Sequence, residues 1–504
     1  MLDVTDVWRK LNPYTVSHTH VCQRYNVCTR IDKFYISSQI LREVNSARII
    51  PFAHSDHHAV TCKITCQQTT KGPGVWHLNT SILNDREYKK QIETFWEMWT
   101  NQKEHIHDIA LWWDIGKSKI KTITQKYCSL KKQEEQAERK TIETRLLKLV
   151  NSDNIPPNLA EEINILKAQI KELDAKEIEG AAIRSKIQWR EQGETNSRFF
   201  CSLEKKNGND KTFDKIKTEN GHLVTDIDDI LSEQVKFYTK LYTKENIDPY
   251  AQNILLSNIT MKLDTENQDK CEGNITQNEC EKALSETSNG KSPGSDGIPY
   301  EFYKEFWYLL KHDFIQVINY VYESGLLSPS QRRGMITLLF KKGERENLAN
   351  WRPITLLNSD YKIISKILAN RLKSVLPCVI NEDQTCGIPG RTINSNLSLL
   401  RDIVNYTNSE KIPAAIICLD QLKAFDRVDW NFIYRTLSAM NFGPNFIKWV
   451  RILYTDISSS IKCNGFVSGA FNPRRGVRQG YPLSTLLNCI VAEVMAEAIR
   501  NESK

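Results

Sequence analysis

An apolar run that ends in one acidic residue constrains the fold of the C-terminal half of this chain more than any other feature. Residues 414–419 read Ala-Ala-Ile-Ile-Cys-Leu, and Asp420 follows them directly. Six apolar residues without a polar break predict a strand that is buried on both faces. A carboxylate at the end of such a strand has a rigid support and can hold a metal ion. A lone strand ending in Asp is common, so the run by itself predicts an α/β fold and one candidate site residue.

A glycine-rich motif, residues 476–484, follows this run and reads Gly-Val-Arg-Gln-Gly-Tyr-Pro-Leu-Ser. Gly480 has no side chain, so the backbone there can approach a ligand closely. Pro482 is a favoured residue in the first turn of a helix. We therefore expect a helix that runs through Leu486 to Ile499, with Arg478 and Gln479 at its start.

Bulk properties narrow the class of protein. A chain of 504 residues with 40% apolar residues predicts two or three domains with real cores. The net charge of +7 fits a nucleic-acid partner and fits an ordinary solvated surface equally well. The sequence contains no run of 18 apolar residues, so no membrane span is predicted, and the N-terminus does not resemble a signal peptide. We expect a nuclear and cytoplasmic protein that is not secreted, with its 13 cysteines as free thiols.

The first 66 residues have the pattern of short strands and turns. Residues 29–37 alternate like a half-buried strand, and residues 49–52 and 59–64 predict two strands around a loop that contains Ser55 to His58. Cys62 and Cys66 lie near three histidines, so zinc is an alternative, but their place in a strand-like segment favours a structural role.

The middle of the chain is predominantly helical. Apolar residues recur at spacings of three and four between residues 82 and 193, and Pro156-Pro157 predicts a break that makes a helical hairpin. Such a hairpin is typically a scaffold or docking element, with RNA contact by a basic face as the alternative. Residues 184–243 interleave basic and aromatic side chains, which suits either base stacking or an ordinary core.

Basic residues flank a predicted loop further along the chain. Phe340 to Gly343 precede this loop and Asn350 to Ile354 follow it, so Lys341 and Arg352 could clamp a triphosphate. Residues 290–297 form a turn-rich loop before an aromatic helix, Tyr300 to Leu310. That loop lacks the Gly-Lys-Ser/Thr ending of a phosphate-binding P-loop.

These motifs together closely resemble the LINE-type non-LTR retrotransposon polyproteins, over roughly residues 275–504. The resemblance implies an RNA-directed DNA polymerase that works by two-metal nucleotidyl transfer, with Asp420 as metal ligand and Mg²⁺, or alternatively Mn²⁺, as cofactor. It places Phe425 beneath the incoming sugar, where a bulky ring excludes a 2′-hydroxyl; a core role is the alternative. The substrate-binding residues that it implies are Phe425, Lys341, Arg352, Arg478, Gln479 and Gly480. The expected partners are an RNA template, a DNA primer or target, and deoxynucleotides, with no membrane.

The N-terminus resembles a second part of the same polyproteins. Arg30-Ile31-Asp32 and Ser55-Asp56-His57 look like the last two motifs of an apurinic/apyrimidinic-type endonuclease. The resemblance implies that Asp32 orients the imidazole of His57 for catalysis and that Asp56 lies at the metal and the attacking water. Paired Asp and His side chains are chemically suited to hydrolysis.

The expected architecture is an α/β and α+β multidomain protein. We assign residues 1–66 to the C-terminal piece of an endonuclease/exonuclease/phosphatase α/β sandwich, residues 67–270 to a long, basic helical linker, and residues 271–504 to the fingers and partial palm of a right-hand polymerase.

Both ends depart from the family pattern. Only about 60 residues of the endonuclease are present, so we expect them not to nick DNA. The family's aromatic-x-Asp-Asp motif does not follow Gly480, and Asp226-Ile-Asp-Asp229 lies too early and has the pattern of an acidic helix start. We therefore expect a polyprotein truncated at both ends, and the alternative to a polymerase is an inactive retroelement remnant that at most binds nucleic acid or protein.

Overall fold

The computed structural model describes residues 3–22, 27–52, 55, 57–65, 72–150, 157–185 and 212–502. The chain forms two compact units. The first contains residues 1–69 and 126–210, and the second contains residues 70–125 and 211–504. Both units contain helices and strands, so the predicted mixed, multidomain class is confirmed at this coarse level.

The first unit begins with three short antiparallel pairs of strands. β1 (Val4–Asp6) pairs with β4 (Tyr35–Ser37), β2 (His20–Cys22) with β3 (Val27–Thr29), and β5 (Val44–Ile50) with β6 (Ala59–Ile64). The helix α1 (Val7–Leu11) and the 3-10 turn η1 (Leu41–Glu43) connect them, and Val7 and Trp8 pack with Ile36, Ala47 and Ile49 as a small core.

Two expectations for this region can be compared with the structure. The predicted strand, loop and strand around Ser55 is confirmed by β5 and β6. The single strand expected over residues 29–37 is instead divided, because β3 ends at Thr29 and β4 begins at Tyr35. Cys62 packs against the small core, Cys66 lies outside the described residues, and no group of three metal-binding side chains occurs among the residues that are described.

Two long helices complete the first unit. α3 (Ile109–Val150) contributes its residues from 126 onward, and α4 (Pro157–Ser185) follows residues that lie outside the described part. Ile142 and Leu146 of α3 pack with Ile163, Leu166 and Ile170 of α4 in one buried cluster. The spacings of three and four residues give each helix one apolar stripe, so the predicted helical hairpin is confirmed.

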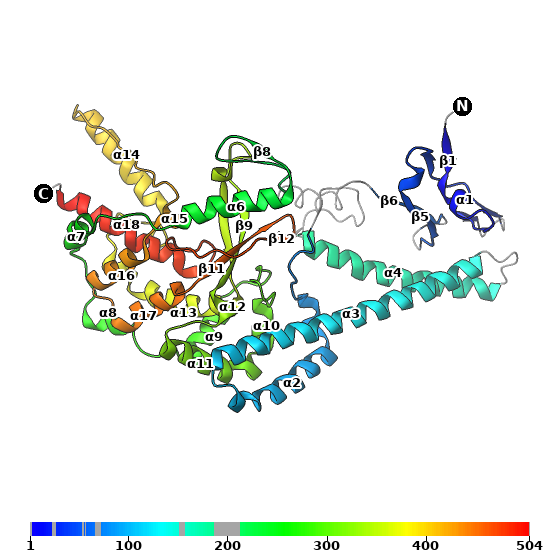
Figure 1. Ribbon diagram of the computed structural model, residues 1–504, viewed down its shortest axis with the longest axis horizontal. Coiled ribbons are helices and arrows are strands. Elements are labelled where there is room, and N and C mark those ends of the chain that lie inside the picture. The colour runs from blue at the N-terminus through cyan, green and yellow to red at the C-terminus, as the bar shows by residue number, and fades with distance from the viewer. Residues whose placement is uncertain are drawn as a thin grey trace. The chain divides into compact units, whose positions relative to one another are not determined.

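A four-stranded sheet organises the second unit, in the order β10–β9–β11–β12. Figure 1 labels three of its strands, β9, β11 and β12. β9 (Arg333–Phe340) and β10 (Trp351–Leu356) form an antiparallel hairpin, whereas β11 (Ser458–Cys463) runs parallel to β9 and turns back into β12 (Phe466–Val467). A parallel pair requires a long crossover, and the helices between β10 and β11 supply it. α6 (Ile227–Tyr242) covers this sheet with Ile230, Tyr238 and Tyr242 packed onto Ile336 and Ile461.

Helices surround the sheet on the rest of this unit. The C-terminal helix α18 (Pro482–Glu502) packs against α13 (Ser359–Val379) and α16 (Trp430–Ala439). Its length and composition would allow it to cross a membrane, but half of that stretch is buried, which is typical of a core helix. The other elements of the unit are η2 (Thr80–Asn84), α2 (Arg86–Thr100), η3 (Lys103–His105), β7 (Ile216–Lys217), β8 (Leu223–Val224), α7 (Pro249–Ser257), α8 (Thr265–Asp269), α9 (Gln277–Ser285), α10 (Tyr300–Glu305), α11 (Trp307–Ser324), α12 (Pro329–Arg332), η4 (Leu348–Asn350), α14 (Ile393–Ser409), α15 (Ala424–Arg427) and α17 (Pro444–Tyr454).

Local sequence signals account for several of these elements. Asp226 caps α6 by accepting a hydrogen bond from the Asp228 backbone, so the acidic stretch is a helix start, as predicted. α18 begins at Pro482, also as predicted. The helix expected from Tyr300 to Leu310 forms as two, since α10 ends before Phe306 and α11 begins after it.

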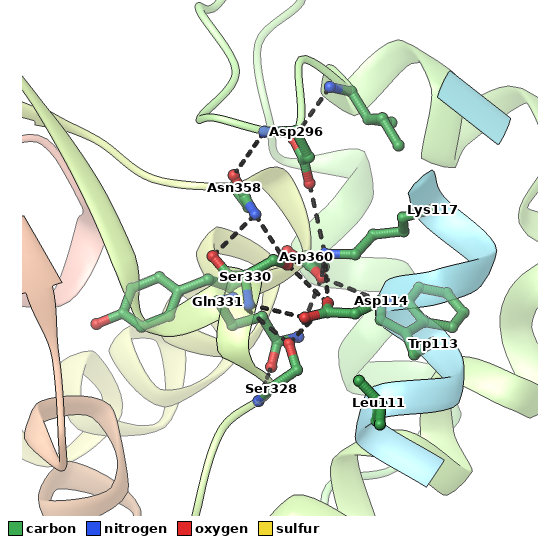
Figure 2. Close-up of polar contacts among 12 residues, drawn as sticks. Leu111, Trp113, Asp114, Lys117, Asp296, Ser328, Ser330, Gln331, Asn358 and Asp360 are labelled. Atoms are coloured by element: carbon green, nitrogen blue, oxygen red, sulfur yellow. Dashed lines mark hydrogen bonds and ion pairs between the residues drawn. The ribbon is translucent and has the colours of Figure 1, made fainter. Parts of the chain in front are cut away.

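One buried lysine joins the helices before residue 126 to the rest of the second unit. Figure 2 shows Lys117 of α3 pointing into a group of three carboxylates, with its ammonium 2.7 Å from Asp360, 3.3 Å from Asp114 and 3.4 Å from Asp296. Its side chain is 4% exposed. Burial tends to lower the pKa of Lys117, but the three carboxylates outweigh it and raise the pKa above its ordinary value.

This Lys117 cluster corrects the predicted domain boundaries. Residues 67–270 are not one linker: residues 70–125 and 211–270 belong to the same compact unit as the C-terminal region, whereas residues 126–210 belong to the first unit. Helical periodicity and basic composition mark a solvated face, but they do not show which core the opposite, apolar face joins.

Candidate functional site

The segment that leads to Asp420 differs from the prediction. Residues 413–420 form no strand, and the side chains of Ile416, Ile417 and Leu419 are 59%, 81% and 67% exposed. The expected buried strand is therefore wrong for this structure. A strand needs a neighbouring strand to satisfy its backbone, and the described residues offer none to this segment. Asp420 is itself exposed, and within the described part of the chain its carboxylate has no hydrogen-bond or ion-pair partner.

The residues after Asp420 are joined to the glycine-rich motif by backbone hydrogen bonds. The backbone N–H of Gly476 donates to the carbonyl of Val428, and that of Val477 donates to the carbonyl of Phe425, each at 2.7 Å. Gly476 has φ +88°, and a Cβ there would lie 2.7 Å from the Asp426 carbonyl, so only glycine fits this approach. The two motifs, distant in sequence, thus form one surface, with Phe425 half-buried in it.

Asp426 lies shortly before α16 but does not cap it. α16 is capped by Asp429, which accepts from the Phe432 backbone. Asp426 is 2% exposed, and its carboxylate accepts hydrogen bonds from Gln479 Nε2 at 2.9 Å and from the Tyr242 hydroxyl at 3.1 Å. Burial raises the pKa of this carboxyl, and the two hydrogen bonds oppose that rise.

Arg478 lies inside the unit. Its side chain is 5% exposed, and one guanidinium nitrogen donates to the backbone carbonyls of Arg332 and Ser458. Burial lowers the pKa of Arg478. The other two guanidinium nitrogens are buried without a hydrogen-bond partner. Arg478 therefore supports the start of β9 and the start of β11, and its predicted contact with a substrate remains a prediction.

The β9–β10 hairpin carries the two basic candidates. The predicted loop is present, since Phe340 ends β9 and Trp351 begins β10, and the side chains of Lys341 and Arg352 are both exposed. The same hairpin contacts the glycine-rich motif, because the Thr355 backbone N–H donates to the Gln479 carbonyl at 2.8 Å. The strand that carries Arg352 is consequently joined through its backbone to the loop that carries Gln479.

The described residues do not assemble a complete metal site. Asp420 offers an oxygen ligand of the type that Mg²⁺ prefers, but no group of three His, Cys, Asp or Glu side chains that could hold a metal ion occurs among the described residues. Two-metal chemistry requires more than one carboxylate, so the described residues by themselves do not supply the ligands of a two-metal site.

The first unit contains a second pair of candidate residues. His57 Nδ1 lies 2.8 Å from Asp32 Oδ2, and this hydrogen bond is the main cause that lowers the pKa of Asp32. The pairing that the resemblance implies is therefore present. Thr19, which is fully buried, fixes Asp32 because its hydroxyl accepts from the backbone N–H groups of Ile31 and Asp32. The ring of His20 packs against that of His57 with centroids 4.6 Å apart.

Asp56, the third residue predicted for this site, lies outside the described residues. Sequence reasoning also missed residues that support both sites: Thr19 and His20 in the first unit, and Tyr242 and Asp426 in the second. Each of these acts through a contact that is distant in sequence, and no local motif marks Thr19, His20 or Tyr242.

Comparison with known proteins identifies the C-terminal region. Residues 340–504 match the reverse transcriptase (RNA-dependent DNA polymerase) family. The chain is 34% identical over 496 residues to the transposon TX1 uncharacterized 149 kDa protein of Xenopus laevis. The matched region covers 97% of this chain and 38% of that protein.

Two further relatives cover shorter stretches. The Pol polyprotein of a type-1 retrotransposable element R2 of Popillia japonica is 28% identical over 40% of this chain and 28% of its own length. A probable RNA-directed DNA polymerase from transposon X-element of Drosophila melanogaster is 26% identical over 42% of this chain and 23% of its own length. This chain thus spans less than two fifths of the relatives that it matches. It carries a reverse transcriptase domain and is related to the polyproteins of non-LTR retrotransposons.

Proposed function

We propose that this chain is part of an RNA-directed DNA polymerase that extends a DNA primer on an RNA template. The observation that carries the proposal is the joined surface of the two motifs, in which Val477 donates to the Phe425 carbonyl and Thr355 donates to the Gln479 carbonyl. These bonds join the segments that carry a bulky ring, an amide and the basic residues of the hairpin. Positioning of the substrate is the main task of such an enzyme, because the metal ions supply most of the charge stabilisation.

Each candidate residue receives a role in this proposal. Asp420 would contribute one carboxylate ligand to Mg²⁺ or Mn²⁺. Phe425 excludes a 2′-hydroxyl from the incoming nucleotide, Gln479 and Gly480 face the nucleotide and its template base, and Lys341 and Arg352 contact the triphosphate. Arg478 supports the loop that presents Gln479.

Primer extension tests the proposal. The chain is incubated with an RNA template, a DNA primer, deoxynucleotides and Mg²⁺, beside the variants Asp420→Ala and Phe425→Val. Extension by the parent chain that falls at least about a thousandfold in Asp420→Ala supports the proposal, because one carboxylate contributes several kcal/mol of transition-state stabilisation through the metal. Phe425→Val is expected to retain extension and to admit ribonucleotides.

A contrary result has a defined meaning. If the parent chain extends no primer but binds RNA in a salt-dependent way, the polymerase proposal fails for this chain. The alternative, a retroelement piece that only binds nucleic acid, is then supported.

The hydrogen bond between Asp32 and His57 favours a separate proposal for the first unit. We propose that residues 1–66 are part of an apurinic/apyrimidinic-type endonuclease sandwich. In this sandwich Asp32 accepts a hydrogen bond from His57 and so holds the imidazole in the tautomer that carries its proton on Nδ1. We expect these residues not to nick DNA within this chain. Metal-dependent nicking of a supercoiled plasmid, abolished by His57→Ala, would contradict that expectation.

A further inference from the structure

A buried carboxylate outside the predicted site controls the side chain of Gln479. Asp426 lies in the four-residue helix α15, one position after Phe425, and is 2% exposed. Its Oδ1 accepts from Gln479 Nε2 at 2.9 Å and from the Tyr242 hydroxyl at 3.1 Å. A carboxylate that is buried to this degree is costly unless donors satisfy it, and these two donors come from α6 and from the glycine-rich motif.

The chemistry of these partners fixes which way the Gln479 amide faces. An ionised carboxylate accepts hydrogen bonds and donates none, so the amide nitrogen of Gln479 must face Asp426. The amide oxygen is then held on the opposite side. A free glutamine amide would alternate between two orientations that present either a donor or an acceptor to a ligand.

The backbone of Gln479 is fixed as well. Its carbonyl accepts from the Thr355 backbone N–H at 2.8 Å, and a Cβ at the neighbouring Gly480 would lie 2.9 Å from the Thr355 carbonyl. Gln479 is therefore held at its backbone by β10 and at its amide by α15, while its side chain stays only partly buried. A side chain held at both ends is preorganised, which reduces the entropy lost when a ligand binds.

We infer that Asp426 is a positioning residue that orients the Gln479 amide toward the deoxynucleotide–template pair, with Tyr242 as a second brace. The inference rests on the proposed polymerase function for the identity of the ligand, but not for the orientation itself. It also gives Tyr242, which lies in the predicted linker, a place beside the site. Phe425 and Asp426 are adjacent in α15. This short helix therefore carries the ring expected at the sugar and, through Asp426, also holds the Gln479 amide expected at the base pair.

The orientation is tested in the full-length protein without any requirement for activity. The side-chain amide of Gln479 is observed in protein labelled with [¹⁵N]glutamine and is assigned from the signal that Gln479→Glu removes. We expect slow hydrogen exchange for this amide in the parent, at least tenfold faster exchange in Asp426→Ala, and an intermediate value in Tyr242→Phe. Asp426→Asn keeps an acceptor and is expected to restore most of the protection.

Two matched variants serve as controls. Tyr238→Phe removes a buried hydroxyl from the same helix that has no hydrogen-bond partner, and Asp429→Asn changes a neighbouring carboxylate that caps α16. Both are expected to leave the Gln479 signal unchanged. Equal exchange in the parent and in Asp426→Ala overturns the inference, as does a change of the same size in both tyrosine variants.

Primer extension then tests the role of the orientation. If Asp426 acts through Gln479, Asp426→Ala raises the KM for deoxynucleotide about tenfold and changes kcat by less than about threefold, and adding Gln479→Ala has little further effect. Equal losses of kcat in both, or additive effects on KM, overturn the positioning role. A parent chain that extends no primer overturns the proposed function instead, and the amide exchange still decides whether Asp426 orients Gln479.

Discussion

Two acidic sites in the second unit are built in opposite ways. Asp360 is fully buried, and its Oδ2 accepts from Lys117, Trp113 and Gln331 at 2.7–3.1 Å. Asp420 is exposed at the end of a segment whose apolar side chains are exposed with it. The partners of Asp360 lie within this chain, whereas the carboxylate of Asp420 has no hydrogen-bond or ion-pair partner among the described residues. The two carboxylates therefore differ in whether distant segments of the chain pack around them.

The largest effect is expected from removing the cation of the Lys117 cluster. Lys117→Met leaves three carboxylates buried without their counter-ion, so we expect the second unit to lose about 3–5 kcal/mol in its free energy of unfolding. Urea titration followed by tryptophan fluorescence measures the change.

Lys119→Met is the matched control on the same helix. Lys119 is exposed, and its ammonium lies 5.2 Å from the ring of Trp99, a contact worth about 0.5–1 kcal/mol. Equal losses in the two variants would contradict the view that the Lys117 cluster joins the upstream helices to this unit.

Substitutions of one isoleucine in each region are expected to differ in how much they lower the free energy of unfolding. Ile461 in β11 is fully buried, and we expect Ile461→Ala to cost about 2–5 kcal/mol. Ile417, before Asp420, is 81% exposed, and the same substitution there should stay within about 0.5 kcal/mol. Thermal unfolding of both variants measures the difference. A large loss at Ile417 would mean that this segment is packed in solution and would break the comparison.

The smallest effect on stability is expected from a carboxylate that forms ion pairs but is exposed to solvent. Glu245 is exposed, and hydrogen bonds from Arg475 and Arg427 lower its pKa to about 2. Because its pKa is lower in the folded state than its ordinary value of 4.5, its contribution to stability is fully present above pH 4.5 and disappears as the pH falls toward 2.

Glu245→Gln should therefore flatten the pH dependence of unfolding between pH 4.5 and 2 and change little at pH 7. Thermal unfolding across this range measures the slope. An unchanged acid slope would show that the ion pairs with Arg475 and Arg427 do not persist in solution, as is common for exposed pairs.

Local patterns predicted the elements whose signals are contained within a short stretch. Asp226 at the start of α6, Pro482 at the start of α18 and the paired strands around Ser55 were all predicted from neighbouring residues. The pairing of Asp32 with His57 came from the family resemblance, and the structure places the two side chains in contact.

The misses share one physical cause. An apolar run such as residues 414–419 predicts a strand, but a strand forms only where a neighbouring strand accepts and donates its hydrogen bonds. In the same way, no local pattern marks the partners of Asp426, because Tyr242 and Gln479 lie 184 and 53 residues away from it. Contacts at such separations have no local signature.

The sequence alone determined the kind of protein, because the order of its motifs and the residue types within them are properties of the chain itself. It supplied Asp420, Phe425 and Gln479 as candidates and marked the helices and their ends. Only the tertiary structure decided that Lys117 is buried among three carboxylates, that Asp426 orients Gln479, and that Asp420 is exposed. Burial and partnership depend on which distant segments pack together, and the free energy of a charged group depends on both.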